Sequence, residues 1–173
     1  MSTAPSRPGR ERPPLLIIAV GNDSRGDDAL GPRLLRELMQ CEAPGLAAGE
    51  WEAIEDYQLQ IEHALDLTGR RRALFIDAGS GTPAPFYFRR IEPGVNPGPG
   101  THVLTPPALL AVYQRIERQS PPAAFVLCLR GERFDLGDDL SPAARHHLAA
   151  GLEFARGLLT DTRLAYWTSQ LRD

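Results

Sequence analysis

The sequence predicts an α/β fold, a three-layer αβα sandwich around a twisted, mostly parallel sheet of about five strands. Three observations lead to this class. Apolar residues gather in short runs, which is typical of buried strands. Segments with leucines at helical spacing separate several of these runs. The resulting alternation of strand and helix is typical of a parallel sheet covered by helices on both faces.

The predicted strands are short runs rich in apolar, β-branched or aromatic side chains. A fully buried parallel strand needs such a run because both of its faces lie against other elements. In chain order, the five predicted strands are residues Leu15–Val20, Trp51–Glu55, Ala73–Ala78, Phe86–Ile91 and Ala123–Leu129.

Four helices are predicted between and after these strands. Ser141 and Pro142 are the N-cap and first residue of the last helix, and Thr105 and Pro106 start the third in the same way. The helices are identified from apolar residues that share one face: Leu30, Leu34, Leu35 and Leu38; Ile61, Leu65 and Leu67; Leu109, Leu110, Val112, Tyr113 and Ile116; Leu148, Leu152, Phe154 and Leu158.

The length of 173 residues and the apolar share of 42% fit a single globular domain. Residues 1–13 are rich in serine, proline and arginine and are predicted to be a disordered lead-in. Residues 14–160 form the predicted α/β domain. Residues 161–173 are a C-terminal tail whose structure the pattern leaves open. The apolar segment Leu15–Val20 is too short for a membrane helix or a signal-peptide core, so we expect a soluble, cytoplasmic protein with no membrane partner.

All 19 basic residues are arginine, and the chain has no lysine. Schiff-base chemistry, a Walker-A phosphate loop and protein-kinase catalysis each require a lysine, so these classes are excluded. The net charge of −3 and the short run Arg70–Arg72 give no reason to expect a nucleic-acid partner. Two cysteines are too few for a disulfide framework, and Cys128 is predicted to be a small buried hydrophobe.

Candidate functional residues follow the predicted strands, because ligands of open α/β sheets bind beyond the carboxyl ends of the strands. Asp27 and Asp28 follow the first strand, Asp77 ends the third, and His102 follows a glycine- and proline-rich loop. Two carboxylates and one imidazole at one edge would form a metal site with open positions, suited to a divalent transition metal. Without a lysine, we expect no fixed cation of the protein's own at this edge.

Taken singly, each of these residues also has a structural interpretation. Asp27 or Asp28 fits a cap for the helix that follows, Asp77 fits a turn, and a lone histidine is more often structural or exposed. The other three histidines lie in helical segments, and we expect them to be at the surface or partly buried and without function: His63, His146 and His147.

The ordered set of motifs resembles the maturation proteases of [NiFe]-hydrogenases. The first motif is GNDSRGDDALG, and the resemblance continues through YQLQIEHALDL, ALFIDAGSG, THVLTPPALL and GDDLSPAARHHL, from about Leu15 to Leu159. The sequence departs from the family at Ala29, where many members have glycine, and in FVLCLRGERFDLG, which lacks the common proline-bearing pattern. The resemblance implies a phosphorylase/hydrolase-like αβα sandwich with a five-stranded sheet.

The resemblance also implies the chemistry. The family's metal-contacting residues correspond to Asp28, Asp77 and His102, and the metal is nickel already held by the substrate, the precursor of the hydrogenase large subunit. The enzyme would cut off the C-terminal extension of that precursor, using a nickel-bound water or one of the carboxylates as base. We expect a monomer that meets its partner transiently. Two alternatives are a non-catalytic accessory protein that binds nickel or the precursor, and a phosphate-accepting receiver domain, which the missing lysine argues against.

Overall fold

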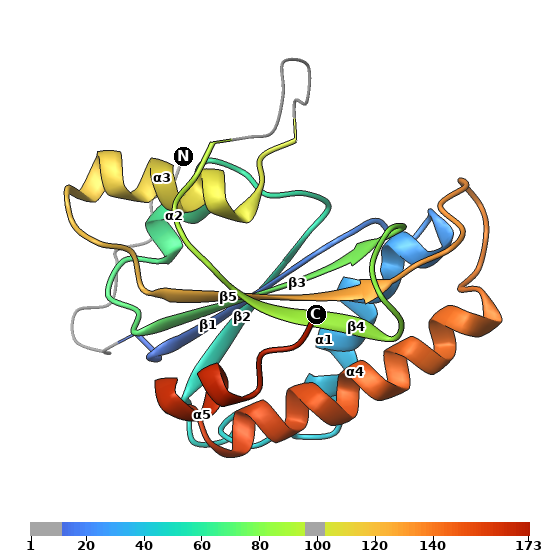
Figure 1. Cartoon of the computed structure of the whole chain (residues 1–173). Coiled ribbons are helices and arrows are strands. Elements are labelled where there is room, and N and C mark those ends of the chain that lie inside the picture. The colour runs from blue at the N-terminus through green and yellow to red at the C-terminus, as the bar shows by residue number, and fades with distance from the viewer. Residues whose placement is uncertain (1–11, 96–102) are drawn as a thin grey trace, which may run out of the picture.

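The computed structural model describes residues 12–95 and 103–173 as three layers (Figure 1). The central sheet has the strand order β2-β1-β3-β5-β4. Its strands are β1 (Leu15–Val20), β2 (Trp51–Asp56), β3 (Arg72–Gly79), β4 (Phe86–Ile91) and β5 (Ala123–Arg130). Neighbouring strands pair in parallel except β4, which is antiparallel to β5. The predicted fold class and all five strands are confirmed.

Helices cover both faces of the sheet. On one face lie α1 (Leu30–Gln40) and α4 (Pro142–Thr160), and on the other lie α2 (His63–Asp66) and α3 (Pro106–Glu117) (Figure 1). The side chains of β1 alternate between the two apolar cores, because successive residues of a strand point to opposite faces. All six residues of β1 are buried, which explains why this strand reads as one apolar run.

Two of the predicted N-caps are confirmed by the structure, and one is not. The side chains of Thr105 and Ser141 accept hydrogen bonds from the backbone N–H groups of Ala108 (3.4 Å) and Ala144 (3.1 Å), as N-caps do. The expectation that Asp27 or Asp28 caps the first helix is wrong. A 3₁₀ turn, η1 (Gly26–Ala29), precedes α1, and neither helix start receives a side-chain cap bond.

The second predicted helix is a single turn, α2, and two of its three predicted inward residues are not inward. Ile61 and Leu65 are exposed, whereas Leu67 is completely buried. A helix of four residues is too short to bury a continuous apolar face, so the spacing of apolar residues in this segment did not predict which side chains contact the core.

The C-terminal residues, whose structure the sequence left open, pack onto the domain. They form α5 (Leu164–Ser169), and Trp167 is completely buried, with its indole N–H donating to the carbonyl of Leu158 (2.9 Å). Beyond α5, Arg172 and Phe88 exchange two backbone hydrogen bonds of 2.9 Å, so the chain end lies against the outer edge of β4. No helix in residues 12–95 and 103–173 is long and apolar enough to cross a membrane.

Candidate active site at the carboxyl edge of the sheet

A cleft of about 330 Å³ lies beyond the carboxyl ends of β1, β2 and β3. It is lined by both Asp28, in the turn after β1, and Asp77, in β3. These are two of the three residues that the sequence singled out, and the sheet topology brings them together because β1 and β3 are parallel neighbours. The remaining walls come from the segment after β2 and from the start of α3.

Asp28 is fixed by the turn that carries it. One of its carboxylate oxygens accepts the backbone N–H of Asn22 (3.1 Å), and its own N–H donates to the carbonyl of Arg25 (3.1 Å). The side chain of Asn22 accepts the N–H of Ser24 (2.9 Å), so Asn22 is a turn residue. The half-buried Asp28 carboxylate therefore reaches the cleft from a closed turn.

Gly31 allows α1 to start directly against the strand ends. A Cβ atom at this position would lie 2.5 Å from the carbonyl oxygen of Val20 and 2.9 Å from that of Ile76. Only glycine permits this approach, which draws the turn bearing Asp28 close to the strand bearing Asp77.

Asp77 lies within β3 and not at its end, because the strand continues to Gly79. Burial raises the pKa of its carboxyl to about 7, opposed by a hydrogen bond from the Ala78 N–H and reinforced by the negative charge of Asp28. Two carboxylates held this close favour a bound cation or a shared proton, which is the electrostatic signature expected from the sequence.

His102 lies outside the described residues. The described chain resumes at Val103, and Val103, Leu104, Thr105 and Pro106 all line the cleft. Among residues 12–95 and 103–173, no group of three or more histidine, cysteine, aspartate and glutamate side chains could hold a metal ion. Of the three predicted ligands, the structure thus places Asp28 and Asp77 in one cleft, and the ligand set itself stays a prediction.

Arg25 corrects one expectation about the charge of this edge. Its side chain lines the cleft together with the two carboxylates, so the protein supplies a fixed cation here after all. Within the described residues, its guanidinium makes no ion pair or hydrogen bond. The absence of lysine did not predict the charge of this edge, because Arg25 lies inside the first motif.

The segment Tyr57–Leu59, which also lines the cleft, is the other contribution that the sequence reasoning missed. It directly follows β2, so the rule that ligands bind beyond strand ends would have found it. His63 holds this segment in place. Its Nδ1 accepts the Gln60 N–H (3.0 Å), which leaves Nε2 protonated toward the carboxylate of Asp56 (3.4 Å). His63 is buried, so the expectation of a surface or partly buried residue is wrong, and its two contacts anchor the loop.

The other two histidines differ from one another. His146 is exposed and His147 is partly buried, both within the expectation, and the Nδ1 of His147 lies 2.8 Å from the carbonyl oxygen of Arg130. Neither lines the cleft.

Cys128 lies beside Asp77 on β5 and is buried, as predicted. Its sulfur lies 3.2 Å from the hydroxyl of Thr82, and burial raises the pKa of the thiol. A thiol kept protonated is a poor nucleophile, so the cleft offers carboxylate chemistry and not thiolate chemistry.

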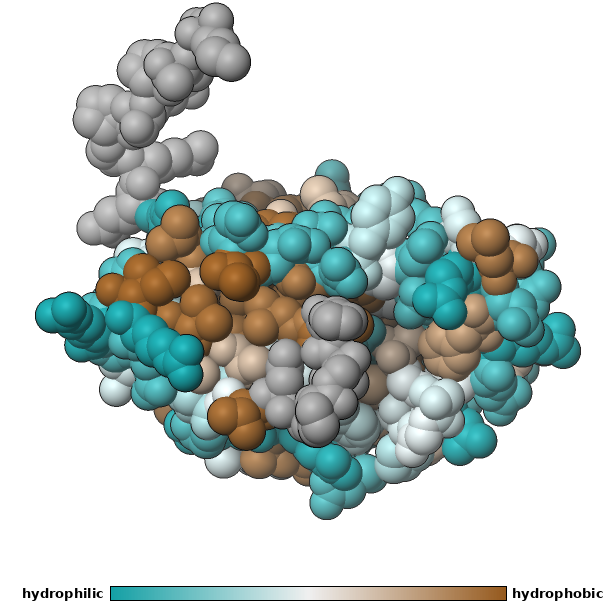
Figure 2. Space-filling view, turned by 90° about the horizontal axis from the view of Figure 1, so that it is seen from above, coloured by the Kyte–Doolittle hydropathy of each residue, from teal (hydrophilic) through white to brown (hydrophobic). Residues whose placement is uncertain are grey.

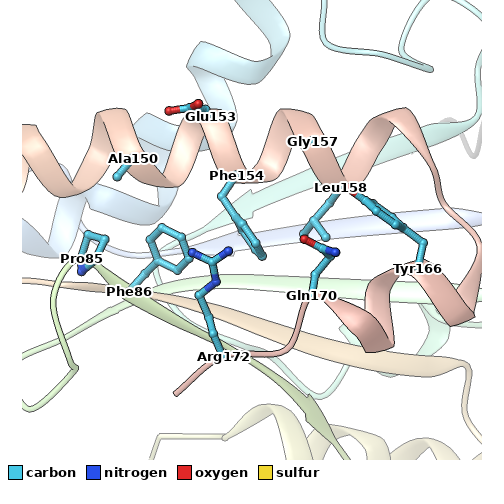
Figure 3. Close-up of a pocket in the computed structure, with 10 residues that line it drawn as sticks. All are labelled: Pro85, Phe86, Ala150, Glu153, Phe154, Gly157, Leu158, Tyr166, Gln170 and Arg172. Carbon is cyan, nitrogen blue, oxygen red and sulfur yellow. The ribbon is translucent and has the colours of Figure 1, made fainter.

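A second cavity, of about 400 Å³, lies between α4, α5 and the start of β4 (Figure 3). Arg172 points into it, and its guanidinium stacks 4.4 Å from the ring centre of Phe154 and 5.1 Å from that of Phe86. Glu153 is the one carboxylate on its walls. With its cation already stacked and no second acid, this cavity lacks the paired groups that the cleft contains.

Comparison with solved structures identifies the class of fold. The [NiFe] hydrogenase maturation protease HycI from Thermococcus kodakarensis superposes with a TM-score of 0.66 and 16% identity, over 86% of this chain and 94% of that one. The hydrogenase maturating endopeptidase HybD from E. coli gives a TM-score of 0.64 and 19% identity, over 86% and 93%. The chain therefore has the fold of the hydrogenase maturation proteases, and the resemblance stated from the sequence is confirmed at the level of the fold.

A third structure of this kind, the hydrogenase 2 maturation peptidase from a Thaumarchaeota archaeon, superposes with a TM-score of 0.58 and 17% identity, over 84% of this chain and 97% of that one. No protein-family model matches the sequence, and no curated protein matches it either.

Proposed function

We propose that this protein is an endopeptidase that removes the C-terminal extension of a [NiFe]-hydrogenase large-subunit precursor after nickel has been inserted. The observation that carries the proposal is the pair Asp28 and Asp77, which share one cleft closely enough for the charge of one to raise the pKa of the other. The fold is the one found in the hydrogenase maturation proteases, and its carboxyl edge is where α/β sheets place ligands.

Nickel enters this proposal as part of the substrate. Asp28, Asp77 and His102 would complete the coordination of a nickel ion that the precursor already holds. A divalent cation favours the ionised form of both carboxylates and relieves their repulsion. Carboxylate and imidazole ligands suit a divalent transition metal. His102 enters from the sequence motif, as the residue that precedes the cleft-lining Val103.

Docking of the metal would bring the scissile peptide bond into the cleft, where hydrolysis needs an activated water. Two routes fit the groups present. The cation of the substrate lowers the pKa of a bound water, or one of the two carboxylates removes the proton from the attacking water. Loading the precursor with a different divalent metal separates them, because only the first route shifts the pH dependence of cleavage with the metal's own acidity.

The surface around the cleft suits a protein substrate. Several large apolar side chains are exposed on the α2 and α3 side of the molecule, and Figure 2 shows apolar residues gathered on this face. Tyr57 and Val103, which line the cleft itself, are 74% and 54% exposed. Exposed apolar surface of this kind marks protein contacts. We propose that the protein acts as a cytoplasmic monomer that meets the precursor transiently.

The test is to incubate the purified protein with nickel-loaded precursor and to measure the intact mass of the precursor. Loss of the C-terminal peptide with nickel-loaded precursor, and not with nickel-free precursor, is the expected result. An unchanged mass, with the protein still bound to the precursor, would show a non-catalytic accessory protein instead. The double variant Asp28→Asn, Asp77→Asn is the control, since it keeps side-chain volume and removes both negative charges.

A further inference from the structure

Asp27 is the most completely buried charged residue in the described chain, with 0% of its surface exposed. Its carboxylate accepts four hydrogen bonds. Three reach one oxygen, from the N–H groups of Glu132 (2.7 Å) and Arg133 (3.0 Å) and from the hydroxyl of Ser141 (2.8 Å). The fourth reaches the other oxygen from the Ser141 N–H (2.7 Å). All four donors belong to the segment between β5 and α4.

Backbone hydrogen bonds join the same two segments. Gly26 and Asp27 donate to the carbonyls of Asp138 (3.0 Å) and Arg133 (2.7 Å), and Gly137 donates to the carbonyl of Ser24 (2.7 Å). Gly26 has a φ of +54°, and a Cβ atom there would lie 2.6 Å from the Arg133 carbonyl oxygen. The glycine therefore permits the close contact between this turn and the β5–α4 loop.

The last residue of the turn that bonds to this loop is Asp27, and the next residue, Asp28, lines the cleft. Asp28 follows Asp27 directly and belongs to the same 3₁₀ turn, η1. Its own ties, to Asn22 and Arg25, are internal to the segment of residues 22–28. On its buried side that segment is held to the β5–α4 loop by Asp27 and its backbone neighbours, while on its exposed side Asp23 pairs with Arg33 and Arg36 of α1. A shift of Asp27 therefore moves the adjoining Asp28.

We propose that Asp27 is a positioning residue for the cleft: its buried carboxylate locks the segment of residues 22–28 onto the β5–α4 loop, and this lock sets where the Asp28 carboxylate stands relative to Asp77. The inference rests on the proposed function for its effect on catalysis, but its structural claim does not depend on that function. Charge-assisted hydrogen bonds to backbone N–H groups are strong enough to hold such a loop.

The variant Asp27→Asn keeps the shape and replaces one acceptor oxygen by an NH₂ group that faces an N–H donor. Arg70→Gln is the matched control. Arg70 is also buried, bonds to the carbonyls of Asp66 (3.0 Å) and Pro13 (2.8 Å), pairs with Glu52, and lies at the opposite end of the strands from the cleft. Both variants lose a buried, charged anchor, but only one anchor adjoins the cleft.

Two readouts are compared at a temperature where both variants are folded. The first is hydrogen exchange of the backbone amides of Asn22 and Asp28, measured by NMR. The second is the kcat for cleavage of nickel-loaded precursor. We expect exchange of both amides at least tenfold faster, and kcat at least tenfold lower, in Asp27→Asn, with both values within twofold of wild type in Arg70→Gln.

Unchanged exchange in Asp27→Asn, or equal acceleration in both variants, would overturn the positioning role. If Asp27→Asn does not fold, Ser141→Ala removes one of the four donors, and the same amides should then exchange at least threefold faster. If wild-type protein does not cleave the precursor, the proposed function fails, while the exchange comparison still decides the inference.

Discussion

Asp27 and Asp28 are neighbours in the chain, yet their carboxylates serve different parts of the molecule. Asp27 turns inward and accepts four hydrogen bonds from Glu132, Arg133 and Ser141, whereas Asp28 lines the cleft with Asp77. One acid therefore contributes to the fold and the other two are available to a ligand. This division predicts opposite effects on stability when Asp27 and Asp77 are changed.

Replacing Asp77 with asparagine is expected to stabilise the metal-free protein at neutral and alkaline pH. Burial raises the pKa of Asp77 from 3.8 to about 7, so the folded state holds a proton that the unfolded state has already lost. Stability of the wild type therefore falls as the pH rises from about 4 to about 7, by roughly 1.4 kcal/mol for each unit of pKa difference. In Asp77→Asn this decline should be absent.

Urea unfolding of both proteins between pH 4 and pH 8 measures the effect. Asp77→Asn should be more stable than wild type at pH 8 while losing cleavage activity. Parallel curves, with the same dependence on pH, would contradict the account of a desolvated carboxyl beside Asp28.

Replacing Asp27 with asparagine is expected to have the opposite effect. Burial raises the pKa of Asp27, but the hydrogen bonds from Glu132, Ser141 and Arg133 outweigh it and leave the pKa below 3.8. The charged form thus stabilises the fold above pH 3.8, and this contribution is lost as the pH falls through the lowered pKa. At pH 7 the variant should lose about 1–3 kcal/mol, the cost of leaving buried donors unpaired.

The same series of urea titrations, extended downward from pH 7 to pH 3, checks this second effect. The difference in stability between Asp27→Asn and wild type should stay constant from pH 7 down to about pH 4 and narrow only below that, toward the lowered pKa of Asp27. A gap that stays constant down to pH 3 would mean that the charge of Asp27 contributes nothing.

Two glycine-to-alanine substitutions should change the stability of the fold in opposite directions. At Gly31 the new Cβ would meet the carbonyl oxygens of Val20 and Ile76, so Gly31→Ala should lower stability by about 1–3 kcal/mol and reduce cleavage. At Gly157, in α4, a Cβ would meet nothing within 4 Å, so Gly157→Ala should raise stability by about 0.5–1 kcal/mol and leave cleavage unchanged. Thermal unfolding measures both effects: a lower melting temperature than wild type for Gly31→Ala, from the steric clash, and a higher one for Gly157→Ala, from helix propensity.

Removal of the Trp167 side chain tests whether the C-terminal segment belongs to the fold. Its indole is completely buried and packs edge-on against the rings of Phe88 and Phe125, with centres 6.0 and 5.2 Å away. Trp167→Ala should cost about 3–5 kcal/mol. Circular dichroism during heating measures the loss, and a melting temperature equal to that of wild type would show that the segment docks without contributing stability.

The sequence predicted the sheet well because its strands are buried on both faces. An apolar run such as Leu15–Val20 has few alternatives to a buried strand, and caps such as Ser141 mark helix starts directly. The short helix near Ile61 and Leu65 was harder, because apolar spacing over one turn does not determine what the side chains contact. The packing of Trp167 depends on contacts with residues far away in the chain, which no local pattern contains.

The site was predicted in part. The strand-end rule placed Asp28 and Asp77 at one edge, and the structure brings them into one cleft. The rule was not applied to the segment after β2, so Tyr57 was missed. The role of Asp27 had no signal in the sequence, because its partners lie more than 100 positions away and two adjacent aspartates equally suggest a helix cap.

The central claim is that Asp28, Asp77 and His102 act together on a nickel-bearing precursor. The most direct test is the rate at which His102→Ala trims nickel-loaded precursor, followed by mass spectrometry, with His146→Ala as the control because His146 is an exposed histidine of α4 that does not line the cleft. The account predicts that His102→Ala is folded and leaves the precursor at full length, while His146→Ala trims it at the wild-type rate. Trimming by His102→Ala at the wild-type rate would contradict it.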